Sequence, residues 1–107
     1  MADLTVEEAH RLWSAGELAI VDVREEREHA ATRIEGVPLL PMGELLERVD
    51  ELPEGTPLAV LCRSGSRSAQ VADYLTAAGG HGEVANVEGG IIAWAAAGLP
   101  YAGDPPR

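Results

Sequence analysis

The sequence predicts an α/β domain with a mainly parallel central sheet flanked by helices. Three short apolar runs that contain β-branched residues, 18–23, 58–61 and 84–87, are typical of strands buried on both faces of a sheet. Helical patterns alternate with these runs, and 107 residues is the size of one compact domain. We therefore expect a single domain over residues 1–101 and a short, frayed tail over 102–107.

The first half of the chain justifies four of these elements. Thr5 and Glu8 have the spacing of a capping box, so a helix is expected over residues 6–15, ended by a glycine. The buried strand 18–23 follows. Residues 24–31 are charged with helical potential, and the proline-punctuated residues 34–41 suit a minor edge strand.

The second half continues the alternation. A helical pattern covers residues 42–49, and a turn at 53–57 leads into the strand 58–61. The next helix runs from 66 to 78, where two glycines stop it, and the strand 84–87 follows. A second glycine pair precedes a short helix over residues 91–97, which is apolar nearly all round and is expected to be buried.

Composition and charge limit the classes of partner. The chain has 18 acidic residues against eight arginines and no lysine, which gives a formal net charge of −10. Such a surface repels phosphate backbones and anionic lipid, so neither nucleic acid nor membrane is expected as a partner. The longest apolar run, Ile91 to Ala97, is too short to cross a bilayer, and the first residues do not resemble a secretory signal. We expect a cytoplasmic protein.

Cysteine and histidine usage argues against disulfides and metals. Cys62 is the only cysteine, which excludes an internal disulfide and a Cys-x-x-Cys redox pair. The histidines at positions 10, 29 and 81 are far apart and lack the spacing of metal ligands. We expect no metal and no other cofactor.

The segment from Cys62 to Ser68 carries the strongest chemical signal. It joins a buried strand to a helix, and a glycine within it permits a tight curl whose backbone N–H groups point inward as an anion-binding nest. A thiol in that position, near Arg63 and Arg67, should have its pKa lowered from the free value of about 8.5. The alternative is a buried core cysteine, but none of the six residues that follow Cys62 is apolar.

Three segments of the chain resemble the single-domain rhodaneses, the thiosulfate sulfurtransferases. Cys-Arg-Ser-Gly-Ser-Arg-Ser at 62–68 looks like their active-site loop, residues 20–28 are similar to their Asp-Val-Arg segment with its following glutamate, and residues 86–100 are similar to their C-terminal signature. The resemblance spans residues 18 to 100 and implies a three-layer rhodanese-like fold. Arg33 stands where the family commonly has a histidine, and His29 stands where it often has an aromatic residue.

The resemblance implies a sulfur transfer through a persulfide on Cys62, with thiosulfate or a related donor and with cyanide, a small thiol or a protein thiol as the acceptor. The loop that binds the donor would consist of Arg63, Ser64, Gly65, Ser66 and Arg67.

Four other residues of the matching segments are interpreted as structural. Arg24 and Glu28 have a spacing that allows them to pair, and Asp22 belongs to the same segment. Trp94 lies in the apolar helix and is interpreted as a core anchor.

Two other functions stay open at this stage. Cysteine phosphatases and arsenate reductases also place a thiolate in a bowl of amides before an arginine, but they enclose five residues where Cys62 and Arg67 enclose four. The third possibility is a carrier module that receives persulfide sulfur from one protein and passes it to another.

Overall fold

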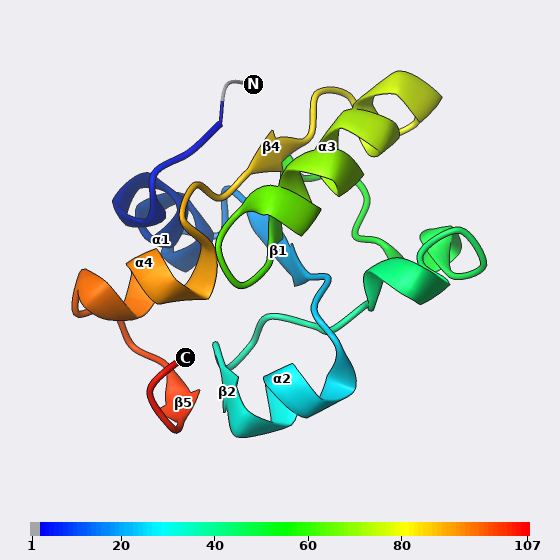
Figure 1. Ribbon diagram of the computed structural model, residues 1–107. Coiled ribbons are helices and arrows are strands. Elements are labelled where there is room, and N and C mark those ends of the chain that lie inside the picture. The colour runs from blue at the N-terminus through cyan, green and yellow to red at the C-terminus, as the bar shows by residue number, and fades with distance from the viewer. Residues whose placement is uncertain (1–2) are drawn as a thin grey trace.

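A parallel sheet of three strands forms the centre of the fold (Figure 1). The computed structural model describes residues 3–107. The strand order is β1 (Ala19–Asp22), β3 (Leu58–Leu61) and β4 (Ala85–Asn86), with both pairs parallel. The expected mainly parallel α/β sheet is therefore confirmed.

Helices cover both faces of this sheet. In Figure 1, α1 (Val6–Ser14) and α4 (Gly90–Ala96) lie to the left of the strands, and α3 (Ser66–Ala78) lies to the right. Side chains alternate between the two faces, as the pleat of a strand requires. In β3, Ala59 and Leu61 join the core under α1 and α4, whereas Leu58 and Val60 join the core under α3. This arrangement is the expected three-layer domain.

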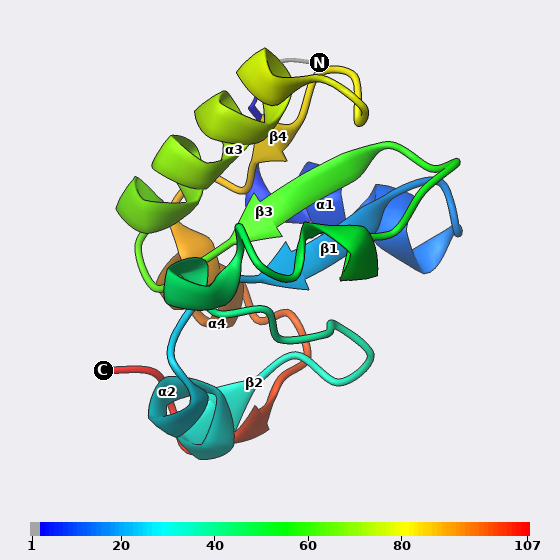
Figure 2. The ribbon, with the colours of Figure 1, turned by 90° about the vertical axis from the view of Figure 1, so that its right-hand side faces the viewer.

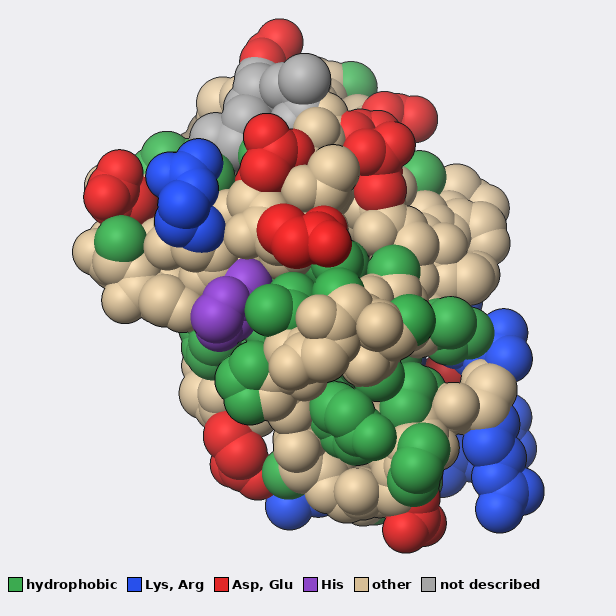
Figure 3. Space-filling model, turned by 90° about the vertical axis from the view of Figure 1, so that its left-hand side faces the viewer, with side chains coloured by type: hydrophobic (Ala, Val, Ile, Leu, Met, Phe, Trp, Pro, Cys, Tyr) green, Lys and Arg blue, Asp and Glu red, His purple; other side chains and the backbone are tan. Residues whose placement is uncertain are grey.

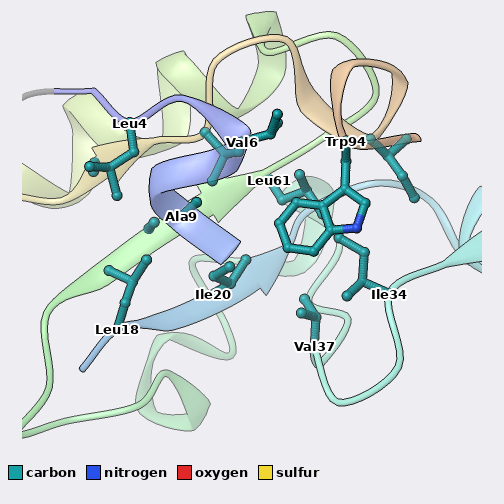
Figure 4. Close-up of a cluster of buried hydrophobic side chains, with 13 residues drawn as sticks. Leu4, Val6, Ala9, Leu18, Ile20, Ile34, Val37, Leu61 and Trp94 are labelled. Atoms are coloured by element: carbon teal, nitrogen blue, oxygen red, sulfur yellow. The ribbon is translucent and has the colours of Figure 1, made fainter. Parts of the chain in front are cut away.

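The core under α1 and α4 is centred on Trp94, whose side chain is fully buried. Figure 4 shows its ring among Ile34, Val37 and Leu61. The indole N–H donates a hydrogen bond of 2.8 Å to the Pro100 carbonyl, so the polar end of the ring is satisfied. The contacts agree with the interpretation of Trp94 as a core anchor.

A small unit lies beyond the C-terminal ends of the strands (Figures 1 and 2). It contains α2 (Glu26–Ala31) and the antiparallel pair of β2 (Thr32–Arg33) and β5 (Ala102–Gly103). The prediction of a frayed tail was wrong for its first residues, because they pair with β2. The Asp104 N–H donates to the Ala31 carbonyl at 2.8 Å, and the Thr32 hydroxyl donates to the Asp104 carbonyl at 2.6 Å.

Two other predicted elements differ from the structure. In place of the helix predicted over 42–49, the structure has two short 3₁₀ helices, Met42–Glu44 and Val49–Glu51, and the second extends beyond the predicted segment. Gly43 disfavours a continuous α-helix, and Leu46 is 69% exposed, so the segment has only a narrow apolar face.

The segment 34–41 forms a single parallel bridge between Leu39 and Asp22 instead of a strand. Its prolines cannot donate to a ladder, but the Pro38 carbonyl still accepts from the Asp22 N–H at 2.9 Å. The predicted helices over 6–15, 66–78 and 91–97 are confirmed to within one residue at each end. None of the helices within residues 3–107 has the length and apolar character needed to cross a bilayer.

Candidate active site

Cys62 directly follows β3, at the end of the sheet that faces α2. The residue is 1% exposed, so its sulfur lies beneath the loop and not on the surface. The loop turns sharply at Gly65, whose φ of +102° lies in the region that favours glycine, and α3 begins at the next residue. The strand thus fixes the sulfur, and the loop closes over it.

Three donors converge on the Cys62 sulfur. The Gly65 N–H lies 3.1 Å from Sγ, the Ser68 hydroxyl 3.2 Å and the Ser68 N–H 3.4 Å. Burial acts to raise the pKa of the thiol, but hydrogen bonds from Ser68, Gly65 and Ser64 outweigh it, so the pKa of Cys62 lies below its ordinary value. This direction was expected from the sequence, which attributed it to the start of the helix and to the nearby arginines, whereas the causes in the structure are hydrogen bonds.

The first two carbonyl groups of this segment, those of Cys62 and Arg63, point toward α4. The Cys62 carbonyl accepts from the Ile91 N–H at 3.0 Å, and the Arg63 carbonyl accepts from the Ile92 N–H at 3.2 Å. Gly90 makes this approach possible, because a Cβ there would lie 2.5 Å from the Cys62 carbonyl oxygen. The first turn of α4 therefore fixes these two carbonyls and leaves the loop amides for the sulfur.

Asn86, at the end of β4, ties the loop to the sheet. Its Nδ2 donates to the Gly65 carbonyl at 3.2 Å, and its Oδ1 accepts from the Ser68 hydroxyl at 2.5 Å. Neither Ser68 nor Asn86 was among the site residues predicted from the sequence. A polar residue within an otherwise apolar strand was the available signal for Asn86, because buried polar side chains need partners.

Arg67 does not stand free beside the sulfur. Its guanidinium donates to both carboxylate oxygens of Glu28, at 2.7 and 2.9 Å. This contact is the main reason why the pKa of Glu28 falls to about 2. The Glu28 pair is also the main cause of the raised pKa of Arg67, to which the Cys62 thiolate contributes. A cation in the first turn of a helix is unfavourable unless an anion compensates it, and the Glu28 carboxylate supplies that anion for Arg67.

The expected side-chain pair between Arg24 and Glu28 was wrong. Arg24 is 2% exposed and binds Asp22 at 2.8 Å, while its other donors reach the Glu28 and Thr32 carbonyls. The backbone turn after β1 brings Arg24 back onto Asp22, and this leaves the Glu28 carboxylate for Arg67. Asp22, Arg24 and Glu28 therefore hold α2 against the loop, which agrees with a structural role for these three residues.

The remaining predicted residues lie on the outer side of the loop. Arg63, Ser64 and Ser66 are exposed. The Arg63 Nε donates to the Arg107 main-chain oxygen, and the two side chains line a hollow with Arg27. Figure 3 shows arginine side chains gathered at the lower right edge of one face and carboxylates over its upper part. A hollow rich in arginine thus lies beside the loop in a strongly acidic protein.

The residues that can bind metals do not cluster within residues 3–107. No group of three or more His, Cys, Asp or Glu side chains in that range could hold a metal ion. His10 instead packs edge-to-face against Trp94, with 5.3 Å between the ring centroids.

Comparisons with known proteins identify the family of the chain. The rhodanese-like domain family matches residues 5–97, and the chain belongs to that family. It is 40% identical over 92 residues to a sulfurtransferase from Allochromatium vinosum, a match that covers 86% of this chain and 85% of the relative. It is 38% identical over 77 residues to a putative sulfur carrier protein from Bacillus subtilis, which covers 72% of this chain and 41% of the relative.

A solved structure shows the same fold over nearly the whole chain. The rhodanese-related protein from Thermoplasma volcanium superposes with a TM-score of 0.85 at 26% identity, over 97% of this chain and all of that one. The resemblance inferred from the three sequence segments is therefore confirmed. These matches support a sulfurtransferase kind of activity.

Proposed function

We propose that the protein transfers sulfane sulfur from thiosulfate, or a related donor, through a Cys62 persulfide to cyanide or a thiol acceptor. The observation that carries the proposal is the buried Cys62 sulfur in a bowl of N–H and O–H donors, with a thiol pKa below its ordinary value. A thiolate is the required nucleophile, and donors of this kind increase the fraction of the thiol that is ionised at a given pH.

The first half-reaction balances without a cofactor. The Cys62 thiolate attacks the outer sulfur of thiosulfate, a new S–S bond forms, and the bond between the two thiosulfate sulfurs breaks with its electron pair on the departing sulfite. The enzyme then holds a persulfide whose outer sulfur carries the negative charge. The backbone amides of the loop from Arg63 to Arg67 would stabilise that charge.

In the second half-reaction an acceptor takes the outer sulfur. Cyanide or a thiolate attacks that sulfur, the bond to Sγ breaks with its electron pair on Sγ, and the Cys62 thiolate is restored. Thiocyanate or a new persulfide leaves. The exposed Arg63, which lines the hollow beside the loop, favours an anionic donor locally, because the acidic groups farther away are screened over about 8 Å at physiological salt.

Phosphatase or arsenate reductase chemistry fits the site less well. Those enzymes need the arginine after the loop to hold a tetrahedral oxyanion, whereas both carboxylate oxygens of Glu28 occupy the Arg67 guanidinium. The four-residue ring between Cys62 and Arg67 also encloses a smaller volume than a five-residue ring.

Steady-state kinetics test the proposal. Sulfite and thiocyanate should appear together from thiosulfate and cyanide, with parallel double-reciprocal plots at several cyanide concentrations, and Cys62→Ser should abolish both products. Gln70→Ala, on the exposed side of α3, serves as the control and should retain full activity. Hydrolysis of an aryl phosphate without any sulfite release would contradict the proposal.

The same experiment addresses a carrier function, which the putative sulfur carrier relative from Bacillus subtilis favours. A carrier would release one equivalent of sulfite per Cys62 and then stop with every small acceptor. Repeated turnover with cyanide or a small thiol would identify an enzyme.

A further inference from the structure

The Ser68 hydroxyl lies between two acceptors that it cannot serve at the same time. Its oxygen is 3.2 Å from the Cys62 sulfur and 2.5 Å from Asn86 Oδ1. All three residues are buried, at 0%, 1% and 7% exposure for Ser68, Cys62 and Asn86. A serine hydroxyl has one proton, so a bond to the thiolate is made at the expense of the bond to the amide oxygen.

The orientation of the Asn86 amide follows from its other partner. Its second end faces the Gly65 carbonyl at 3.2 Å, and a carbonyl can only accept, so the NH2 group must point there. The oxygen therefore points at Ser68. The Asn86 backbone is also fixed, because its N–H donates to Asp3 Oδ1 at 3.2 Å and its carbonyl accepts from the Leu4 N–H at 3.0 Å.

The protonation state of the sulfur decides which bond Ser68 makes. With a Cys62 thiol, the S–H can donate to the Ser68 oxygen, Ser68 to Asn86, and Asn86 to Gly65, so every donor has an acceptor. With a thiolate, the Ser68 hydroxyl turns to the sulfur, and Asn86 Oδ1 loses this donor. In a persulfide the charge moves to the outer sulfur, so the hydroxyl can return to Asn86.

We propose that Asn86 is a positioning residue that competes with Cys62 for the Ser68 proton and so sets how readily the nucleophile forms. Its effect on the thiol stands on this geometry alone, and the further effect on the persulfide rests on the proposed function. Competition from Asn86 makes the thiolate less stable than the loop alone would make it. The same competition favours conversion of the thiolate to the persulfide, because attack on the sulfur donor frees the Ser68 hydroxyl to bond again with Asn86 Oδ1.

The substitutions of Ser68 and Asn86 leave the charged groups around the loop unchanged. They are Arg63 in the loop, the Arg67–Glu28 pair from α3 and α2, and the Asp22–Arg24 pair at the end of β1. The residues of β4 and α4 carry no ionisable side chain. Substitution of Asn86 or Ser68 by an uncharged residue therefore changes the hydrogen bonds without changing the charges.

The pH dependence of Cys62 alkylation by iodoacetamide tests the competition in the full-length protein. Ser68→Ala should raise the thiol pKa, because it removes a donor to the thiolate. Asn86→Ala should lower it and speed alkylation below the pKa by about two- to tenfold, the worth of one hydrogen bond. In the Ser68→Ala background, Asn86→Ala should have no further effect.

A structural role for Asn86 gives a different pattern. If the Asn86 side chain only holds the loop through its bond to Gly65, Asn86→Ala should raise the thiol pKa both in the wild-type protein and in the Ser68→Ala variant. Either that result or an unchanged thiol pKa would overturn the proposal. Asn86→Leu, of similar volume, guards against a cavity or poor folding in Asn86→Ala and should shift the pKa in the same downward direction. Gln70→Ala is the matched control for loss of an amide.

The outcome does not depend on sulfur transfer. Alkylation needs only the thiol, so an inverse pair of pKa shifts supports the competition even if thiosulfate is not a substrate. Conversely, sulfite release with an unchanged alkylation profile would keep the proposed function and remove the role of Asn86.

Discussion

Replacement of Gly90 by alanine should detach the active-site loop from α4. The residue has a φ of +59°, and its added Cβ would meet the carbonyl oxygens of both Cys62 and Arg63. The backbone must then move, which weakens the two hydrogen bonds from Ile91 and Ile92. At about 0.5–1.5 kcal/mol for each bond, together with about 1–2 kcal/mol for the positive φ, the free energy of unfolding should fall by about 2–5 kcal/mol.

Gly98→Ala is the matched control. Gly98 has a similar φ of +78°, but nothing lies within 4 Å of its added Cβ. It should lose only the backbone term of about 1–2 kcal/mol and should keep its thiol pKa and sulfur transfer. Urea unfolding gives the two stabilities, and alkylation gives the thiol pKa, which should rise in Gly90→Ala as the amides move away from the sulfur. Equal behaviour of the two variants in both assays would refute the account of how α4 orients the loop.

Two substitutions and one insertion test the charges and the size of the loop. The free energy of unfolding of Glu28→Gln should be about 1–2 kcal/mol lower than that of the wild type at pH 7, after allowance for solvent screening. Because the pKa of Glu28 in the folded protein, about 2, lies below the ordinary 4.5, the carboxylate stabilises the fold only where it is ionised. Urea titrations should therefore show the stability difference between the two proteins decreasing as the pH falls from about 4.5 to 2. Arg63→Ala should weaken thiosulfate use, and added salt should narrow its difference from wild type in initial-rate assays; a salt-insensitive difference would exclude long-range attraction. A glycine inserted between Gly65 and Ser66 should slow sulfite release at least about tenfold, and an unchanged rate would exclude ring size as the selector.

The sequence predicted the elements whose local pattern and tertiary packing agree. The capping box of α1, with the Thr5 hydroxyl accepting from the Glu8 N–H at 3.2 Å, needed no long-range information. The strands around Ile20 and Val60 were equally predictable from local sequence, because a strand covered on both faces is apolar throughout. The nest before α3 followed from a glycine between a strand and a helix.

Other parts depend on contacts between distant residues, which no local pattern reveals. The pairing of β5 with β2 joins residues about seventy apart, and its two-residue strands have no periodicity to detect. The partner of Glu28 was misassigned because a spacing of four suggested Arg24, whereas Arg67 reaches it from another helix. Asn86 was missed for the same reason, since its place beside Ser68 depends on the order of the strands.

Intact-mass analysis after thiosulfate treatment tests the central claim most directly. The wild-type protein should gain the mass of one sulfur atom, dithiothreitol should remove it, and Cys62→Ser should gain nothing. The chain has no second cysteine to resolve the persulfide as a disulfide, so the adduct should persist until an acceptor is added. Absence of the adduct in the wild-type protein, or its presence in Cys62→Ser, would contradict the assignment of Cys62 as the sulfur-carrying nucleophile.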